Sequence, residues 1–268
     1  MVKDLSYFHL PKINSSTLYS ILKRFIKVFI PKELLRQTEP FLRNIYSIFY
    51  FGNKVECAVC GNHHSKFIVL KNGVDTLCAN CGSLPRNRLL WMYLSNELNI
   101  KTTHYSLLHF SPAKSIKRKL KELKNIEYTT TDYEKGEDKQ FDITSINDDD
   151  NRYDLIICYH VFEHIVEDAK AMKELFRVLK SGGKALLQVP LKEGDTYEDF
   201  SITSPTERLK HFGQDDHVRI YGNNNFEERL KNAGFMVKAV PYATNFSDET
   251  IVRNGLNKQE LIFVCTKK

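Results

Sequence analysis

Four cysteines occur as two CxxC pairs, Cys57 with Cys60 and Cys78 with Cys81, and a glycine follows each pair. Seventeen residues separate the two pairs. Each CxxC turn can present two thiolates, and this separation is typical of a hairpin that brings two such turns around one tetrahedral zinc ion. Four thiolates leave no ligand position for water, so the expected zinc site is structural and not catalytic. Two redox-active pairs or disulfides are the alternatives, and they suit an intracellular chain less well.

A second group of reactive side chains follows a short apolar run at residues 155–158. Tyr159, His160, Glu163 and His164 come directly after this run. An unbroken apolar run is typical of a strand that is buried on both faces of a parallel sheet. Open α/β sheets bind their ligands outside the carboxyl ends of the strands. We therefore expect these four side chains to lie at a ligand crevice.

The residues around this group predict a strand–helix–strand unit. Met172, Leu175, Phe176 and Leu179 repeat at helical spacing, and Gly182-Gly183 is expected to end that helix in a left-handed conformation. Such a unit is a right-handed crossover, so a parallel, doubly wound sheet is the expected core. A further helix is expected at 224–233, and strands are expected at 105–110, 126–131, 185–189, 235–240 and 261–265.

Three segments together resemble one known family. Glu163-His164 followed by ELFRVLKSGGKALLQVP resembles the fourth strand, the following helix and the fifth strand of class I S-adenosylmethionine-dependent methyltransferases. The turn His109-Phe110-Ser111-Pro112 and the segment FGQDDHVRIYG are similar to a bacterial branch of that family with an N-terminal four-cysteine knuckle. The resemblance extends from about residue 103 to the C-terminus. It implies a Rossmann-like α/β fold whose sheet is mostly parallel with an antiparallel last strand.

The resemblance also implies a set of residues that bind S-adenosylmethionine. Asp132 ends the second strand and would accept hydrogen bonds from both ribose hydroxyls, and Asp142 with Ile143 would lie against the adenine. The Gly-rich GxGxG loop of most class I methyltransferases is absent after the first strand. The expected cofactor-binding residues are His109, Phe110, Ser111, Pro112, Asp132, Asp142, Ile143, Tyr159, His160 and His164.

Residues 191–222 form a polar insertion after the fifth strand, where the family recognises its acceptor. A hydroxyl acceptor must lose a proton during transfer, and histidine has a pKa suited to that role. His217 and His160 are the candidate catalytic bases, with His217 preferred; the alternative for His217 is a purely structural role that fixes the insertion to the sheet. The candidate acceptor-binding residues are Glu198, His211, Gln214, Asp216 and Arg219.

The N-terminal segment is basic and amphipathic. Residues 1–54 hold nine Lys or Arg and three Asp or Glu, so the whole formal net charge of +6 lies there. A helix is expected at 16–30 and a second from Glu33 towards Tyr50, interrupted at Pro40. Residues 16–50 can lie on an anionic membrane surface, or pack on the domain or on a second subunit as a homodimer. The neutral remainder argues against nucleic acid as a partner.

These features predict a division into an arm at 1–54, a zinc knuckle at 55–83 that docks on the core, and a methyltransferase domain at 84–268. Ser83 is expected to cap the helix that leaves the knuckle, and Arg86 and Arg88 to hold an anionic group of the substrate or to pair with surface carboxylates. The absence of a signal peptide and of a long apolar stretch favours a cytoplasmic protein, with a peripheral position at the inner membrane face as an option.

The predicted function is O-methylation of a small-molecule or glycan acceptor, namely a sugar or a surface-glycan precursor. S-adenosylmethionine is the expected methyl donor. This acceptor class follows only from the family resemblance. A non-catalytic zinc-knuckle binding protein with a degenerate cofactor site is one alternative. An RNA or protein methyltransferase is the other.

Overall fold

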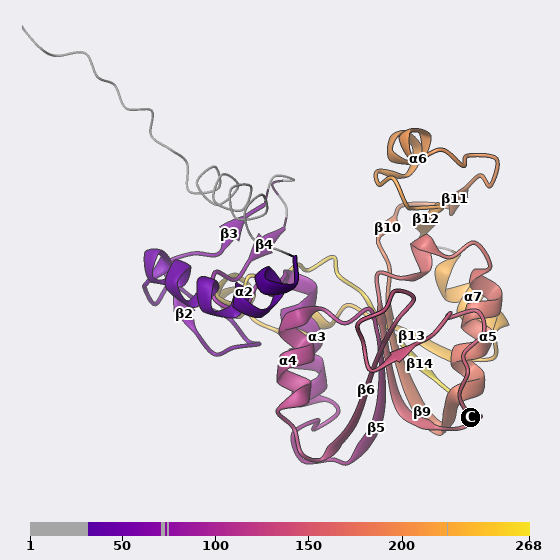
Figure 1. The fold of residues 1–268 in the computed structure, drawn as a ribbon, viewed down its shortest axis with the longest axis horizontal. Coiled ribbons are helices and arrows are strands. Elements are labelled where there is room, and N and C mark those ends of the chain that lie inside the picture. Colours follow the sequence, from indigo (N-terminus) through magenta and orange to yellow (C-terminus); the bar gives the residue numbers. More distant parts are fainter. Residues whose placement is uncertain (1–31, 71–72, 74, 224) are drawn as a thin grey trace, which may run out of the picture.

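The computed structural model describes residues 32–70, 73, 75–223 and 225–268 (Figure 1). The helix expected at 16–30 lies outside the described residues. The second expected helix is present as α2 (Lys32–Ser47), followed by the short helix η1 (Ile48–Tyr50). Among the described helices, none is long and apolar enough to cross a membrane.

A seven-stranded sheet forms the centre of the molecule, in the order β13-β14-β9-β8-β5-β6-β7. The five strands from β9 to β7 run parallel, and β14 and β13 are each antiparallel to their neighbours. The mostly parallel sheet with an antiparallel ending is therefore confirmed. The strands are β5 (Tyr105–Phe110), β6 (Ile126–Asp132), β7 (Lys139–Gln140), β8 (Tyr153–Tyr159), β9 (Leu179–Gln188), β13 (Met236–Val240) and β14 (Ile262–Thr266).

Helices cover both faces of this sheet (Figure 1). Alternate residues of β8 point to opposite faces, so Leu155 and Ile157 join one apolar core and Ile156 and Cys158 join the other. On the first face lie α3 (Pro85–Asn96) and α4 (Lys114–Lys121), and on the second lie α5 (Asp168–Val178) and α7 (Phe226–Asn232).

The cysteine segment forms two short hairpins. β1 (Val55–Glu56) pairs with β2 (His63–His64), and β3 (Ile68–Val69) pairs with β4 (Thr76–Leu77). The glycine after each CxxC pair has a positive φ and donates its N–H to the carbonyl of the first cysteine of the pair, at 2.7 and 3.0 Å. A residue with a side chain would strain these two turns.

The knuckle and the domain share one apolar core. Cys57, Val59 and Cys78 belong to the same buried cluster as Leu90 of α3 and Leu107 of β5. At the far end of the chain, α8 (Asp248–Asn254) and the 3-10 helix η3 (Tyr242–Asn245) also lie on this side, and Arg253 forms a 3.1 Å ion pair with the knuckle. The knuckle is thus docked on the domain.

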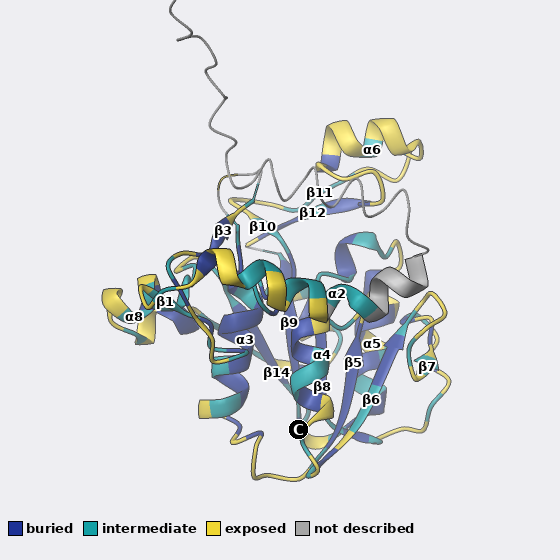
Figure 2. Ribbon diagram, turned by 60° about the vertical axis from the view of Figure 1, so that its left-hand side comes forward, coloured by how far each residue is buried: buried dark blue, intermediate teal, exposed yellow. Residues whose placement is uncertain are grey.

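The insertion adds a small sheet and one helix above the carboxyl ends of the main strands (Figures 1 and 2). In the sheet, β12 (Arg219–Gly222) pairs with β10 (Leu191–Lys192) on one side and with β11 (Tyr197–Glu198) on the other. The helix α6 (Pro205–Phe212) lies between β11 and β12 in sequence and is largely exposed (Figure 2).

Three local expectations were wrong. The helix α2 continues through Pro40, which was expected to interrupt it. Further along α2, Asn44 accepts a 2.6 Å hydrogen bond from Asn80 of the knuckle. Tertiary contacts of this kind can stabilise a helix that lacks one N–H donor. The helix α5 ends at Val178, so Gly182, with its φ of 78°, lies within β9 and does not end the helix. Leu84 and not Ser83 precedes α3, because the Ser83 hydroxyl faces the cysteine sulfurs.

Candidate functional site

The predicted ligand crevice lies at the topological switch point of the sheet, where the strand order reverses. β5 pairs with β6 on one side and with β8 on the other, so the carboxyl ends of these three strands are neighbours. Two residues directly after strands are left-handed there, Ser111 with a φ of 42° and His160 with a φ of 55°. Non-glycine residues in this conformation are uncommon and gather at functional sites. Ser111 thus makes the sharp turn that glycines make in related loops.

A cleft of about 550 Å³ opens beside the ends of β5 and β6. Pro112 and Asp132, both expected to bind the cofactor, lie in its wall. One oxygen of Asp132 accepts a 3.2 Å hydrogen bond from the N–H of Glu134, and the other has no partner among the described residues. The remaining wall comes from α2, the knuckle, α4 and the loop after β6: Glu39, Arg43, Cys81, Lys114, Lys117, Arg118, Lys121, Glu134, Lys135, Gly136 and Glu137.

The other eight expected cofactor residues do not line this cleft, and four of them have a different environment that the structure defines. Phe110 and Ile143 are buried in the core of the second face. His109 is buried within β5, where its Nδ1 lies 2.9 Å from the hydroxyl of Tyr128 and burial lowers its pKa to about 3. This neutral histidine is held inside the sheet, so the expectation that it touches the cofactor is wrong. Asp142 is exposed, and its carboxylate accepts hydrogen bonds from the N–H and the hydroxyl of Thr144.

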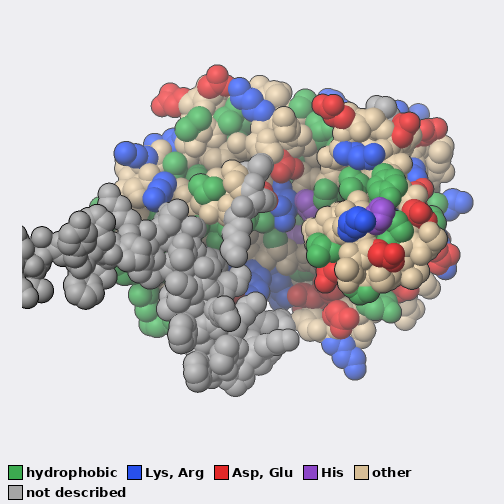
Figure 3. Space-filling model, turned by 90° about the horizontal axis from the view of Figure 1, so that it is seen from above, with side chains coloured by type: hydrophobic (Ala, Val, Ile, Leu, Met, Phe, Trp, Pro, Cys, Tyr) green, Lys and Arg blue, Asp and Glu red, His purple; other side chains and the backbone are tan. Residues whose placement is uncertain are grey.

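The crevice residues after β8 meet the insertion in a histidine cluster. His164 and His217 pack edge to face with ring centroids 4.7 Å apart, and Glu163, His164 and His217 offer ligand atoms within 4.8 Å of one another. The Nδ1 atom of His160 lies 3.2 Å from Glu163 Oε1, and that of His164 lies 3.3 Å from Asp216 Oδ2. From above, histidine side chains are visible in the hollow beside the insertion (Figure 3).

Burial shapes the chemistry of this cluster. Glu163 is 1% exposed and His217 is 4% exposed. Glu163 Oε2 and His217 Nε2 are buried and have no hydrogen-bond partner in the described part of the chain. Burial, followed by the nearby His164, lowers the pKa of His217 below its ordinary value. Sequence reasoning placed Glu163 at the crevice but gave it no role.

Two expected acceptor residues serve the structure of the insertion instead. Arg219 is 1% exposed and donates to the carbonyls of Ile165 and Val166, at 2.7 and 2.9 Å. It also forms ion pairs with Asp168 at 2.9 Å and with Glu198 at 2.8 Å. Because each of its three side-chain nitrogens is engaged in the interior, the expected contact of Arg219 with an acidic acceptor group is wrong.

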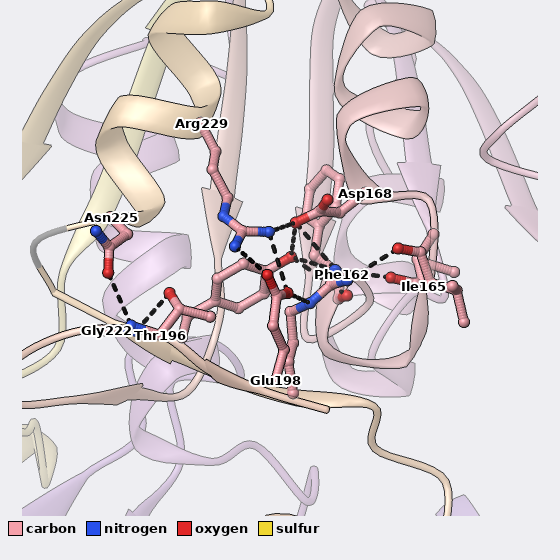
Figure 4. Close-up of polar contacts among 11 residues, drawn as sticks. Phe162, Ile165, Asp168, Thr196, Glu198, Gly222, Asn225 and Arg229 are labelled. Atoms are coloured by element: carbon pink, nitrogen blue, oxygen red, sulfur yellow. Dashed lines mark hydrogen bonds and ion pairs between the residues drawn. The ribbon is translucent and has the colours of Figure 1, made fainter. Parts of the chain in front are cut away.

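Arg229 completes this network, which sequence reasoning missed. From α7 it forms ion pairs with Asp168 at 2.8 Å and with Glu198 at 2.6 Å (Figure 4). The hydroxyl of Tyr221 donates to Asp168 over 2.7 Å. Glu198 is therefore held by two arginines, which explains why it does not face an acceptor. Its partners lie 21 and 31 residues away in sequence, so no local spacing pointed to them.

The other predicted residues divide between the crevice and the outer surface. Tyr159 is 9% exposed, and its hydroxyl is buried without a partner among the described residues. His211 lies on exposed α6, where its Nδ1 is 2.8 Å from the hydroxyl of Tyr197. Gln214 is exposed in the following loop, as is Asp216. Only Asp216 of these loop residues contacts the histidine cluster.

The four cysteines form the cluster that their spacing predicts. Cys57 Sγ lies 3.5 Å from Cys81 Sγ, and Cys60 Sγ lies 3.8 Å from Cys78 Sγ. Tetrahedral Zn–S bonds of about 2.3 Å place sulfurs about 3.8 Å apart, so these side chains fit one zinc ion. Ser83 was missed: its hydroxyl lies 3.1 Å from Cys57 Sγ and 3.2 Å from Cys81 Sγ, where it can donate to a thiolate.

Comparison with known proteins adds the following findings. Residues 109–240 match the family described as "Methyltransferase domain". A methyltransferase structure from Mesorhizobium loti is similar at 11% identity and a TM-score of 0.48, over 66% of this chain and 96% of that chain. The YcgJ protein from Bacillus subtilis is similar at 14% identity and a TM-score of 0.43, over 66% of this chain and 98% of that chain. A comparison with curated protein sequences gives no match. The match identifies residues 109–240 as a methyltransferase domain, and the order of the seven-stranded sheet agrees with the Rossmann-like fold expected of S-adenosylmethionine-dependent methyltransferases.

Proposed function

We propose that this enzyme methylates a hydroxyl group of a small polar acceptor, and that a sugar or a surface-glycan precursor is the acceptor. The observation that carries the proposal is the histidine cluster, which forms where the residues after β8 meet the insertion. Bound S-adenosylmethionine supplies a methyl group on a sulfonium. A hydroxyl oxygen is a weak nucleophile, so a site for such an acceptor needs groups that remove its proton.

Two separate groups of residues would bind the cofactor and remove the acceptor proton. Asp132 at the cleft would hold the ribose of the cofactor through its unpartnered oxygen, and Asp142 stays a prediction for the adenine. His160 and His217 would assist loss of the acceptor proton, because both belong to the cluster at the end of β8. Glycan chemistry itself rests on the family resemblance.

The test is an acceptor screen with the full chain. The protein is incubated with S-adenosylmethionine and a panel of nucleotide sugars and glycans, and products are detected by mass spectrometry as a gain of one methylene. We expect His160→Asn and His217→Asn to reduce turnover by on the order of a hundredfold. His104→Asn, at an exposed histidine outside the cluster, is the matched control. Methylation of RNA or protein, but of no sugar, would contradict the acceptor assignment.

We also propose that the arm binds an anionic membrane surface and holds the enzyme at the inner membrane face. Support comes from large apolar side chains on α2, on η1 and directly after it, which are 46 to 88% exposed: Phe41, Ile45, Ile48, Phe49 and Phe51. Apolar side chains beside a basic segment favour insertion at the headgroup level. The double variant Phe49→Ser/Phe51→Ser should reduce sedimentation with anionic vesicles, with Val252→Ser, at an exposed valine of α8, as control. Equal sedimentation of both variants would overturn this proposal.

A further inference from the structure

The histidine cluster has the composition of a metal site that is distinct from the four cysteines. Glu163, His164 and His217 each offer one ligand atom, and these atoms lie within 4.8 Å of one another. Glu163 and His164 come from the 3-10 helix η2 (Phe162–His164) after β8, and His217 comes from the insertion. The backbone holds the two segments together, because the N–H of Val218 donates to the carbonyl of Glu163 over 2.9 Å.

Two buried atoms of the cluster lack the partner that burial demands. A carboxylate in the interior is costly unless it is paired, hydrogen-bonded or bound to a metal. Among the described residues, Glu163 Oε1 has His160 as its only ion-pair partner and Oε2 has no partner at all. His217 Nε2 is also buried without a partner. A cation between these side chains would satisfy both atoms at once.

We propose that Glu163, His164 and His217 bind one divalent metal ion. Two imidazoles and one carboxylate are a ligand set used for Zn²⁺, Fe²⁺ and related ions in catalytic sites, which keep positions open for water or substrate. The 3.3 Å contact of His164 Nδ1 with Asp216 fits this assignment, since ligating histidines commonly pair their other nitrogen with a carboxylate. Asp216 is 62% exposed at its side chain, so it is a positioning residue at the rim.

The acceptor would bind by coordinating this ion. This inference rests on the function proposed above. An acceptor hydroxyl, or two neighbouring hydroxyls of a sugar, would take the open positions, and coordination lowers the pKa of such a group. The new O–CH₃ bond then forms as the S–CH₃ bond breaks and its electron pair stays on sulfur. With His217 as a ligand, His160 is the histidine left to receive the hydroxyl proton.

Metal binding is measured on the full chain without any reference to activity. The protein is loaded with zinc and dialysed, its zinc is counted by elemental analysis, and Mn²⁺ is then titrated with detection of the free ion by electron paramagnetic resonance. Oxygen and imidazole ligands accept Mn²⁺, whereas a four-thiolate site selects zinc. We expect one site per chain beyond the cysteine cluster, filled by retained zinc or by added Mn²⁺.

Variants of single ligands decide between this site and adventitious binding. His164→Ala and Glu163→Gln should abolish the second site, and Asp216→Asn should weaken it about 10- to 100-fold. His104→Ala is the matched control, and thermal melting confirms that each variant is folded; His164 is the mildest change because its side chain is 32% exposed. Absence of a second site in the wild-type chain, or unchanged binding in His164→Ala, would overturn the proposal. Metal binding without methylation of any sugar would overturn the acceptor and leave the metal site standing.

Discussion

The role of Arg88 became apparent only from the three-dimensional structure. The sequence predicted that it would meet an anionic substrate group or a surface carboxylate. Its side chain is instead fully buried, and it donates to the carbonyls of Ser83, Asn254 and Gly255, each at 2.7 Å. Neutral carbonyls from a distant segment leave no charge pattern in the sequence, so the role of Arg88 was not predictable from its neighbours.

The predicted role of Asp132 in binding the cofactor ribose can be tested by measuring affinity. Asp132→Ala should weaken S-adenosylhomocysteine binding by about 1.5 to 3 kcal/mol, the usual contribution of a hydrogen bond to a charged group. The reason is that its unpartnered oxygen lies in the wall of the cleft. Isothermal titration calorimetry measures the affinity.

The control for this measurement is Asp149→Ala, an exposed aspartate in the acidic turn before β8. Its affinity should equal that of the wild-type chain. Equal affinity of the Asp132 variant and the control would exclude Asp132 as a ribose ligand.

At the scale of elements, the sequence predicted the strands that are buried on both faces. β5 and β8 match their apolar runs to within a few residues, because such runs have no other stable place in an α/β domain. The insertion was not predicted as a sheet. Its strands β10 and β11 have two residues each, too few for any hydrophobic alternation, and their pairing depends on β12, more than twenty residues later.

Close backbone packing within the insertion gives a testable consequence. A Cβ atom on Gly222, the last residue of β12, would lie 2.1 Å from the carbonyl oxygen of Gly194 and 2.6 Å from the N–H nitrogen of Thr196. Gly222→Ala must therefore push the β10–β11 loop away and should destabilise the fold by about 1 to 3 kcal/mol. Chemical denaturation measures the loss.

The matched control replaces Gly194 in the same loop, where a Cβ atom would contact nothing within 4 Å. Gly194→Ala should lower the free energy of unfolding by only about 1 to 2 kcal/mol, because alanine must adopt the left-handed φ of 80°. If Gly222→Ala also impairs turnover beyond its effect on the folded fraction, the insertion positions the acceptor. A Gly222 variant as stable as the wild type would show that the loop yields freely.

At the scale of the whole molecule, the knuckle and the domain share one apolar core. Because Cys57 and Cys78 belong to the same apolar core as β5, loss of a thiolate ligand should unfold more than the knuckle. We expect one zinc per chain in the cysteine site, and we expect Cys78→Ser to lose it and to lower the melting temperature of the entire protein. Cys265→Ser, at a buried cysteine of β14 outside the cluster, controls for the loss of a buried thiol. A metal-free chain with the wild-type melting temperature would contradict the zinc assignment.

We expect two parts of the arm to differ in function, and a truncation series tests this. Glu39 and Arg43 of α2 line the cleft beside β5 and β6, and Glu39 forms an ion pair with Lys114 of α4. A chain lacking residues 1–31 should keep its affinity for S-adenosylhomocysteine and lose vesicle binding. Removal of residues 1–50 should weaken cofactor binding as well, because it takes away one wall of the cleft. Equal cofactor affinity in both truncations would place α2 outside the site.

The partners of Arg88 also set the order in which the chain can finish folding on the ribosome. The hydrogen bonds to Asn254 and Gly255 join residues 166 and 167 positions apart. An emerging chain can form both cysteine turns early, yet the buried guanidinium of Arg88 stays without these acceptors until α8 has been synthesised. Contacts of such long sequence separation form late and slowly. The knuckle thus cannot be completed before α8 has emerged, and a nascent chain stalled before α8 would expose the knuckle to chaperones and proteases.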